Sequence, residues 1–167
     1  MKKILLMLAC VLFLSGCTAK TAVVPSEEFD PNKVQADNFD PTIDWDQVAE
    51  DCEDLFLDES FYPYVKNMSL SVDPEKEEIG LIFAVDDDTK PEDAKKYAVD
   101  FLENFNEIVR IQNFSIAKAG DDTYGGIYDE YAVSIGIAPD STKDDDSTWF
   151  INERLEKGEF RELALQK

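Results

Sequence analysis

The stretch that decides the fold is IGLIFAVDDDTKPEDAKKYAVDFLENFNEIV, residues 79–109. Apolar side chains recur at every second position from Ile79 to Val85, which is the pattern of a strand with one face in the core. From Ala94 to Val109 the apolar side chains instead fall on one broad helical stripe. Thr89 and Glu92 have the spacing of a capping box at its start. The stretch therefore predicts a strand followed by a long amphipathic helix that packs on the sheet.

The flanking segments predict further elements of the same domain. Asp44 can cap a first helix that extends to Phe56. A β-hairpin is predicted next, from the alternation between Met68 and Val72, a turn at Asp73-Pro74 and the strand at 79–85. Phe114 to Ile116 and Tyr131 to Ile137 predict a second hairpin, and the tail from Ser147 to Gly158 favours a short helix. The expected fold is α+β, ordered α-ββ-α-ββ-α, with an antiparallel sheet built from two hairpins and the central amphipathic helix on one face.

The N-terminus has the features of a targeting segment. Lys2 and Lys3 precede an apolar run, residues 4–14, that is too short for a stable membrane span but long enough for a signal peptide. Leu14-Ser15-Gly16-Cys17 then resembles the lipobox of bacterial lipoproteins. The resemblance implies cleavage before Cys17, a diacylglycerol on its sulfur, and a lipid-anchored domain on the extracytoplasmic side of the cell membrane. We expect a signal peptide at 1–16, an acidic leash at 17–43 and one domain at 44–167.

The charge of the chain restricts its partners. A total of 37 Asp and Glu against 16 Lys and Arg gives a formal net charge of −21. Such a surface repels nucleic-acid phosphates and anionic lipid headgroups, and it attracts cations and basic proteins. We therefore expect no nucleic-acid partner; the expected ligand is a protein or peptide, and the charge favours a basic one.

The absence of histidine restricts the chemistry. Ser–His and Cys–His nucleophilic pairs and His-ligated zinc sites are impossible without it. Cys52, the one cysteine left outside the signal peptide and the anchor, falls on the apolar face of the first predicted helix, which indicates a buried structural thiol. Since no cofactor motif is present, the sequence favours a non-enzymatic protein over an enzyme of unrecognised type.

The acidic runs suggest calcium as the one ion that the domain could hold. A helical crossover between the second and third predicted strands makes these strands parallel, so the acids that follow the second strand and those that follow the third should leave the sheet at the same edge. The predicted ligands are Asp86, Asp87, Asp88, Asp121 and Asp122. Asp144–Asp146 is expected at the opposite edge. The alternative interpretation is solvated charge that precedes helices.

Two further surfaces are candidates for binding. Tyr124, Tyr128 and Tyr131 surround a glycine-containing loop and can form either a binding edge for sugars or peptides or ordinary packing. The second face of the sheet carries small residues, including Ser134 and Gly136, so another segment of the chain or a partner should pack closely against it. Helix one or the tail could cover this face, or it could be a shallow surface for a partner.

Overall fold

The computed structural model describes residues 42–166, and its first element is helix α1, Trp45–Phe56. The Asp44 carboxylate accepts a hydrogen bond from an amide of the first turn at 3.2 Å, so the predicted cap is confirmed. The buried positions of the helix recur every fourth residue and therefore lie on one face. They are Val48, Cys52 and Phe56.

The predicted first hairpin is confirmed as strands β1 (Val65–Asp73) and β2 (Glu78–Val85). The two strands pair antiparallel, with Leu70 opposite Leu81. In the turn between them the Asp73 carboxylate accepts the Lys76 amide at 3.0 Å, which fixes the reversal that Asp73-Pro74 predicts.

Helix α2 (Pro91–Gln112) packs its apolar stripe against the face of the sheet that carries the large side chains of β2. Phe83 and Phe101, both from the stretch quoted at the outset, stack with ring centroids 3.6 Å apart. The predicted capping box is wrong, because the helix is capped at Lys90 without a side-chain hydrogen bond. The hydroxyl of Thr89 is buried and has no hydrogen-bond partner among the described residues.

The prediction of a strand at 114–116 is also wrong, since this segment belongs to a loop that is tied to α2. The Asn106 side chain donates to the carbonyl of Ala117 at 3.0 Å and accepts from the amide of Ile127 at 3.2 Å. Arg110 donates to the carbonyl of Ile116 at 2.9 Å. Because side chains of α2 bind this backbone, the carbonyls of 116 and 117 have partners without joining a sheet.

The loop leads through the short helix α3 (Ile127–Glu130) to strand β3 (Ala132–Pro139), the segment predicted as the fourth strand. Strand β3 pairs parallel with β2, with Glu78 opposite Ala132 and Val85 opposite Pro139. The second pair of strands is therefore not the hairpin that the sequence predicts between 114–116 and 131–137.

The antiparallel partner of β3 is strand β4 (Ile151–Leu155), which lies where the sequence favours a short helix. Ile151 and Leu155 are four residues apart, so both face the core in a strand as well as in a helix. The inward position between them is Glu153, whose carboxylate pairs with Arg161 at 2.6 Å. Gly158 follows the strand with a φ of 68° and belongs to a turn, not to a helix end.

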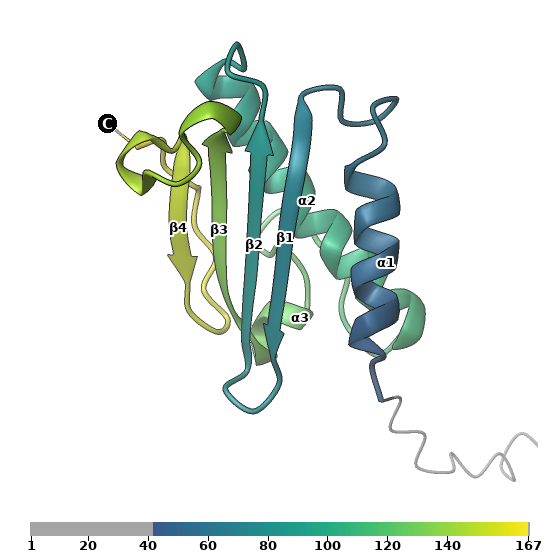
Figure 1. The fold of residues 1–167 in the computed structure, drawn as a ribbon. Coiled ribbons are helices and arrows are strands. Elements are labelled where there is room, and N and C mark those ends of the chain that lie inside the picture. Colours follow the sequence, from purple (N-terminus) through teal and green to yellow (C-terminus); the bar gives the residue numbers. More distant parts are fainter. Residues whose placement is uncertain (1–41, 167) are drawn as a thin grey trace, which may run out of the picture. The chain divides into compact units, whose positions relative to one another are not determined.

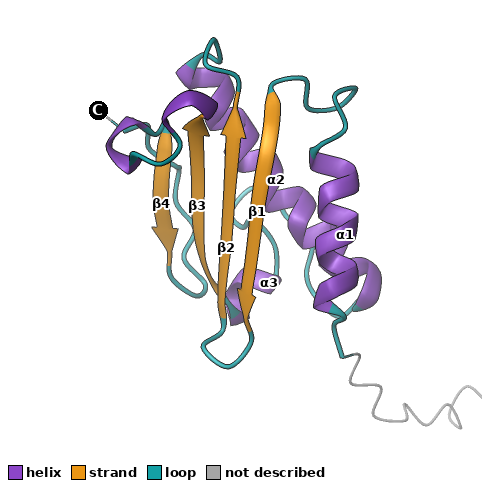
Figure 2. Cartoon of the chain, viewed as in Figure 1, coloured by secondary structure: helices purple, strands orange, loops and turns teal. Residues whose placement is uncertain are grey.

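The four strands form one mixed sheet in the order β1-β2-β3-β4 (Figure 1). Helices α1, α2 and α3 contribute to a single core on one face of this sheet, and Figure 2 shows no α-helix in front of the other face. The α+β class and the central helix on one face are confirmed, while the sheet is only partly antiparallel. Within residues 42–166, no helix is long and apolar enough to cross a membrane. The predicted signal peptide, Cys17 and the leash up to residue 41 lie outside the described residues.

Candidate outer-face binding site

The face of the sheet turned away from α2, called the outer face below, is built mainly from small and polar side chains. Strand alternation and register place a specific set of residues on it. These residues are Asn67, Ser69, Ser71, Gly80, Ile82, Ala84, Ser134, Gly136, Ala138, Asn152 and Arg154. Ile82 is the one large apolar residue among them and is 39% exposed. Because large apolar side chains are otherwise absent and Gly80 and Gly136 have no side chain, other groups can approach the backbone of the sheet closely there.

The segment between β3 and β4, residues 140–149, covers part of this face. It contains two short 3-10 turns, Asp140–Thr142 and Asp146–Thr148. The Trp149 ring lies so close to Gly136 that a Cβ on residue 136 would overlap it. The prediction that something approaches Gly136 is thus confirmed. Trp149 belongs to the predicted tail, Ser147 to Gly158, which was one of the two candidates, whereas helix one packs into the core on the other face.

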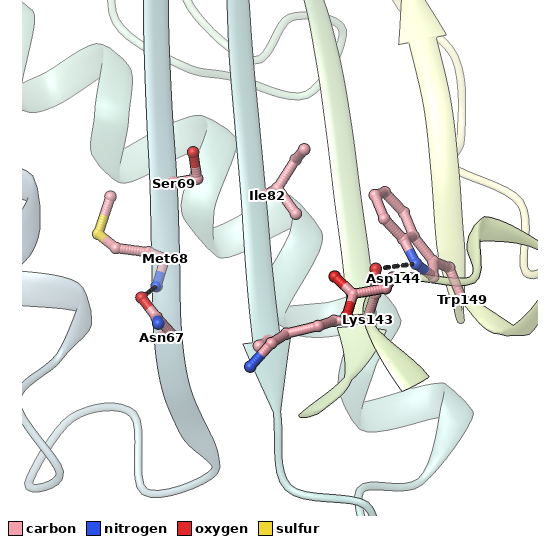
Figure 3. A pocket seen from close by; sticks show the side chains of 8 residues that line it. Asn67, Met68, Ser69, Ile82, Lys143, Asp144 and Trp149 are labelled. Atoms are coloured by element: carbon pink, nitrogen blue, oxygen red, sulfur yellow. Dashed lines mark hydrogen bonds between the residues drawn. The ribbon is translucent and has the colours of Figure 1, made fainter. Parts of the chain in front are cut away.

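Two open pockets lie along the uncovered part of the outer face, and Ile82 lines both. The first has a volume of about 250 Å³ and lies between the start of β1 and Trp149 (Figure 3). The second has a volume of about 420 Å³ and lies over Gly80, between Ser71 and Ser134. Since paired strands advance ~3.3 Å per residue, the surface from Ala84 to Glu78 extends for roughly 20 Å.

The cations beside the outer face are held by neighbouring carboxylates. Arg154 pairs with Glu78 at 2.8 Å and with Glu156 at 3.0 Å. Lys143 pairs with Asp140 at 2.7 Å, and this hydrogen bond raises the pKa of the Lys143 ammonium. A ligand therefore meets little uncompensated positive charge on this face.

The predicted calcium ligands do not form one site. The strand parallel to β2 is 132–139, so the acids that share the sheet end with Asp86–Asp88 are those of the 140–149 segment. The Asp87 carboxylate accepts the amide of Ser141 at 3.0 Å, which shows this proximity directly. Asp121 and Asp122 lie instead in the loop that precedes α3. The expected grouping was wrong because the predicted strand at 114–116 does not exist.

The acidic side chains are also not gathered as metal ligands. Among residues 42–166, no three Cys, Asp or Glu side chains lie close enough together to hold a metal ion. The carboxylate of Asp86 pairs with Lys66 at 3.2 Å and accepts the amide of Asp88 at 3.2 Å, and these contacts lower its pKa.

The three tyrosines predicted as a binding edge are packed on the helical side of the sheet. Tyr128 is buried and its hydroxyl donates to the carbonyl of Leu102 at 2.8 Å. Tyr124 is buried and donates to the carbonyl of Arg161 at 2.8 Å. Tyr131 makes an edge contact with Trp45. Of the predicted binding residues, the outer face thus holds Ser134 and Gly136 without the tyrosines.

Cys52 has the structural place that the sequence predicts. Its side chain is fully buried within the core. Burial, reinforced by the carboxylates of Asp51 and Glu53, raises the pKa of the thiol to about 12. At neutral pH the thiol is protonated and is a poor nucleophile.

Trp149 and Asp144 are the residues of the first pocket that the sequence analysis missed. Neither belongs to a periodic pattern, and both come from a connection between strands. The usable signal was Gly136 in the middle of a strand, which requires a close neighbour; it pointed to the tail as one candidate but not to Trp149 within it. The chain matches no protein-family model, and comparison with curated proteins and with solved structures gives no significant match.

Proposed function

We propose that this chain is a membrane-anchored, extracytoplasmic and non-enzymatic binding module, which takes an extended segment of a basic protein or peptide on the outer face of its sheet. The observation that carries the proposal is the pair of pockets that both reach Ile82, on a sheet face that no α-helix of the described residues covers. A surface of roughly 20 Å accommodates about six residues of an extended chain.

Charge favours a basic ligand. The chain has a net charge of −21, and the two cations beside the pockets are already paired with carboxylates. A positively charged segment is therefore attracted from a distance, and its association is fast and sensitive to salt. The hydroxyls of the serines on β1 and β3 can donate to and accept from the backbone of such a segment.

The anchor is part of the same proposal. Cys17, with the preceding apolar run, supports attachment through a diacylglycerol, which holds the domain beside the membrane surface. Mass spectrometry of the mature N-terminus tests it, with Cys17→Ser expected to abolish lipid attachment. An unmodified mature N-terminus at another residue would contradict the anchor while leaving peptide binding to be judged separately.

A fluorescence titration tests the binding proposal. The chain has two tryptophans, and Trp45→Phe leaves Trp149 in the first pocket as the single reporter. The probe is a peptide of about ten residues in which Lys alternates with Val, and a peptide with Glu in place of Lys is the control. We expect the Lys peptide to bind, and its affinity to fall steeply between low salt and ~0.5 M NaCl.

A matched pair of variants locates the site. Ile82→Arg places bulk and positive charge at the centre of the outer face, and Ile111→Arg makes the same change at another exposed isoleucine. Binding should be lost in Ile82→Arg and retained in Ile111→Arg. Equal affinity of both variants, absence of binding by the Lys peptide, or equal binding of the Glu peptide would overturn the proposal.

A further inference from the structure

The first pocket combines an apolar floor, an indole ring and a carboxylate. Ile82 and Ala84 of β2 form its floor beside Ser69 of β1, and Trp149 and Asp144 stand at its other side (Figure 3). These groups are contributed by the β1–β2 hairpin and by the segment that precedes β4, which is distant from it in sequence. The pocket is therefore apolar at its floor and polar at one side, so a ligand side chain can contact apolar atoms with its stem and polar atoms with its tip.

The indole of Trp149 is held in place before any ligand arrives. Its Nε1 donates to the carbonyl of Lys143 at 3.0 Å, and the ring packs against Gly136. Thr148, the preceding residue, bonds to Thr142 through its hydroxyl at 2.8 Å. A fixed ring loses little conformational entropy when a ligand binds against it.

Asp144 supplies a carboxylate without a direct partner among the described residues. Its carboxylate forms no ion pair and accepts no hydrogen bond from the residues that the structure describes, whereas the neighbouring Lys143 is paired with Asp140. The Lys143 ammonium is thus bound by Asp140, and its pKa is raised by this contact and, to a smaller extent, by the charge of Asp144, whose carboxylate oxygens stay open to a ligand. A positively charged group in the pocket would meet both this carboxylate and the electron-rich face of an indole.

We propose that this pocket receives a lysine or arginine side chain of the bound segment. The aliphatic stem lies over Ile82 and Ala84, and the cationic head lies between Trp149 and Asp144. Long cationic side chains commonly bury the stem and leave the head among polar groups. This assignment rests on the proposed function and identifies the side chain that anchors the ligand.

A pair of peptides that differ at one position tests the assignment. Both have one central residue flanked by Ser and Val, and this residue is Lys in one peptide and norleucine, which has a similar stem without the charge, in the other. Binding is followed by Trp149 fluorescence in the Trp45→Phe background and by amide chemical shifts of β2. We expect the Lys peptide to bind about two- to fivefold more tightly.

The charge of Asp144 is tested against an acid outside the pocket. Asp144→Asn should remove most of the preference for Lys over norleucine, and Asp121→Asn, an equal loss of charge in the loop before α3, should preserve it. Equal affinity of the two peptides, or the same loss in both variants, would overturn the side-chain assignment. A basic peptide that still binds in a manner sensitive to Ile82→Arg would leave the proposed function intact.

A small amine offers the same ammonium chemistry as a lysine side chain. Spermidine is therefore titrated alone and as a competitor. The assignment predicts that it competes weakly, because it makes no contact with the strand backbone along the rest of the outer face. Spermidine that binds the Trp149 pocket as tightly as the Lys peptide would show a site for free amines and would contradict a peptide ligand.

Discussion

Substitution of Gly136 by alanine tests the packing that shapes the pocket. A Cβ at this position would lie 2.9 Å from Cε3 of Trp149 and still nearer to Cζ3, closer than Cβ atoms approach other groups. The ring cannot move freely because its Nε1 is bonded to the carbonyl of Lys143. Gly136→Ala should therefore displace the indole from the sheet.

The expected cost follows from two opposing effects. Overpacking of a fitted contact costs about 1–3 kcal/mol of unfolding free energy. Alanine in a strand gains about 0.5–1 kcal/mol over glycine because the unfolded chain has less conformational freedom. The two effects together give an expected net loss of about 0–2.5 kcal/mol, centred near 1 kcal/mol. In a Trp149→Ala background the added methyl meets no ring, so the same change should become neutral or stabilising.

Urea unfolding of the four proteins in this cycle, followed by circular dichroism, measures the coupling. The midpoint of Gly136→Ala should fall by roughly 1 M at constant slope. The coupling free energy between the two sites should be about 1–3 kcal/mol. A coupling below about 0.5 kcal/mol, or a loss of the same size in both backgrounds, would refute the contact between Trp149 and Gly136.

Three further predictions concern the core and its boundaries. Burial raises the pKa of the Cys52 thiol to about 12, so Cys52 should resist alkylation at pH 8 until urea unfolds the protein. The thiol ionises near 9.0 in the unfolded chain, so its contribution to the unfolding free energy is complete below pH 9 and should fall as the pH rises toward 12. This loss of stability at high pH should be smaller in Cys52→Ala. Asn106→Ala should lower the unfolding free energy by about 1–3 kcal/mol, since Ile127 loses a buried hydrogen bond and Ala117 a partly buried one. Hydrogen exchange should quicken in residues 113–127. Asp44→Ala should cost about 1 kcal/mol in urea unfolding through loss of the helix cap, whereas Asp44→Asn should retain most of the stability.

The predicted strand at 114–116 and the predicted helix at 147–158 failed for one common reason. The spacing of Ile151 and Leu155 fits a helix and a strand equally well. In the strand, Glu153 points inward, and Arg161 compensates its carboxylate by an ion pair. Ile116 resembles a strand residue in isolation, but Arg110 binds its carbonyl from α2. In each case a group from elsewhere in the chain supplies the partner that local periodicity cannot reveal.

The errors in the candidate sites followed from this difference in topology. Residues 114–116 do not form a strand, and the parallel neighbour of β2 is 132–139. This pairing brings Asp140 and Asp144 to the end of the sheet that holds Asp87. The same change leaves Asp121 in a loop before α3. Which acids meet was therefore decided by strand pairing and not by their spacing in the sequence.

The sequence by itself determined the elements that bury a continuous local face: α1, the β1–β2 hairpin, α2 and β3, with Cys52 in the core and a second sheet face of small residues. Periodicity suffices there because each segment contains its own apolar pattern. Only the tertiary structure decided that β4 is a strand, that Trp149 covers Gly136, and that Asp144 stands beside Ile82 in the pocket. These features depend on contacts between distant segments, whose geometry is set by the packed sheet and not by the order of residues within either segment.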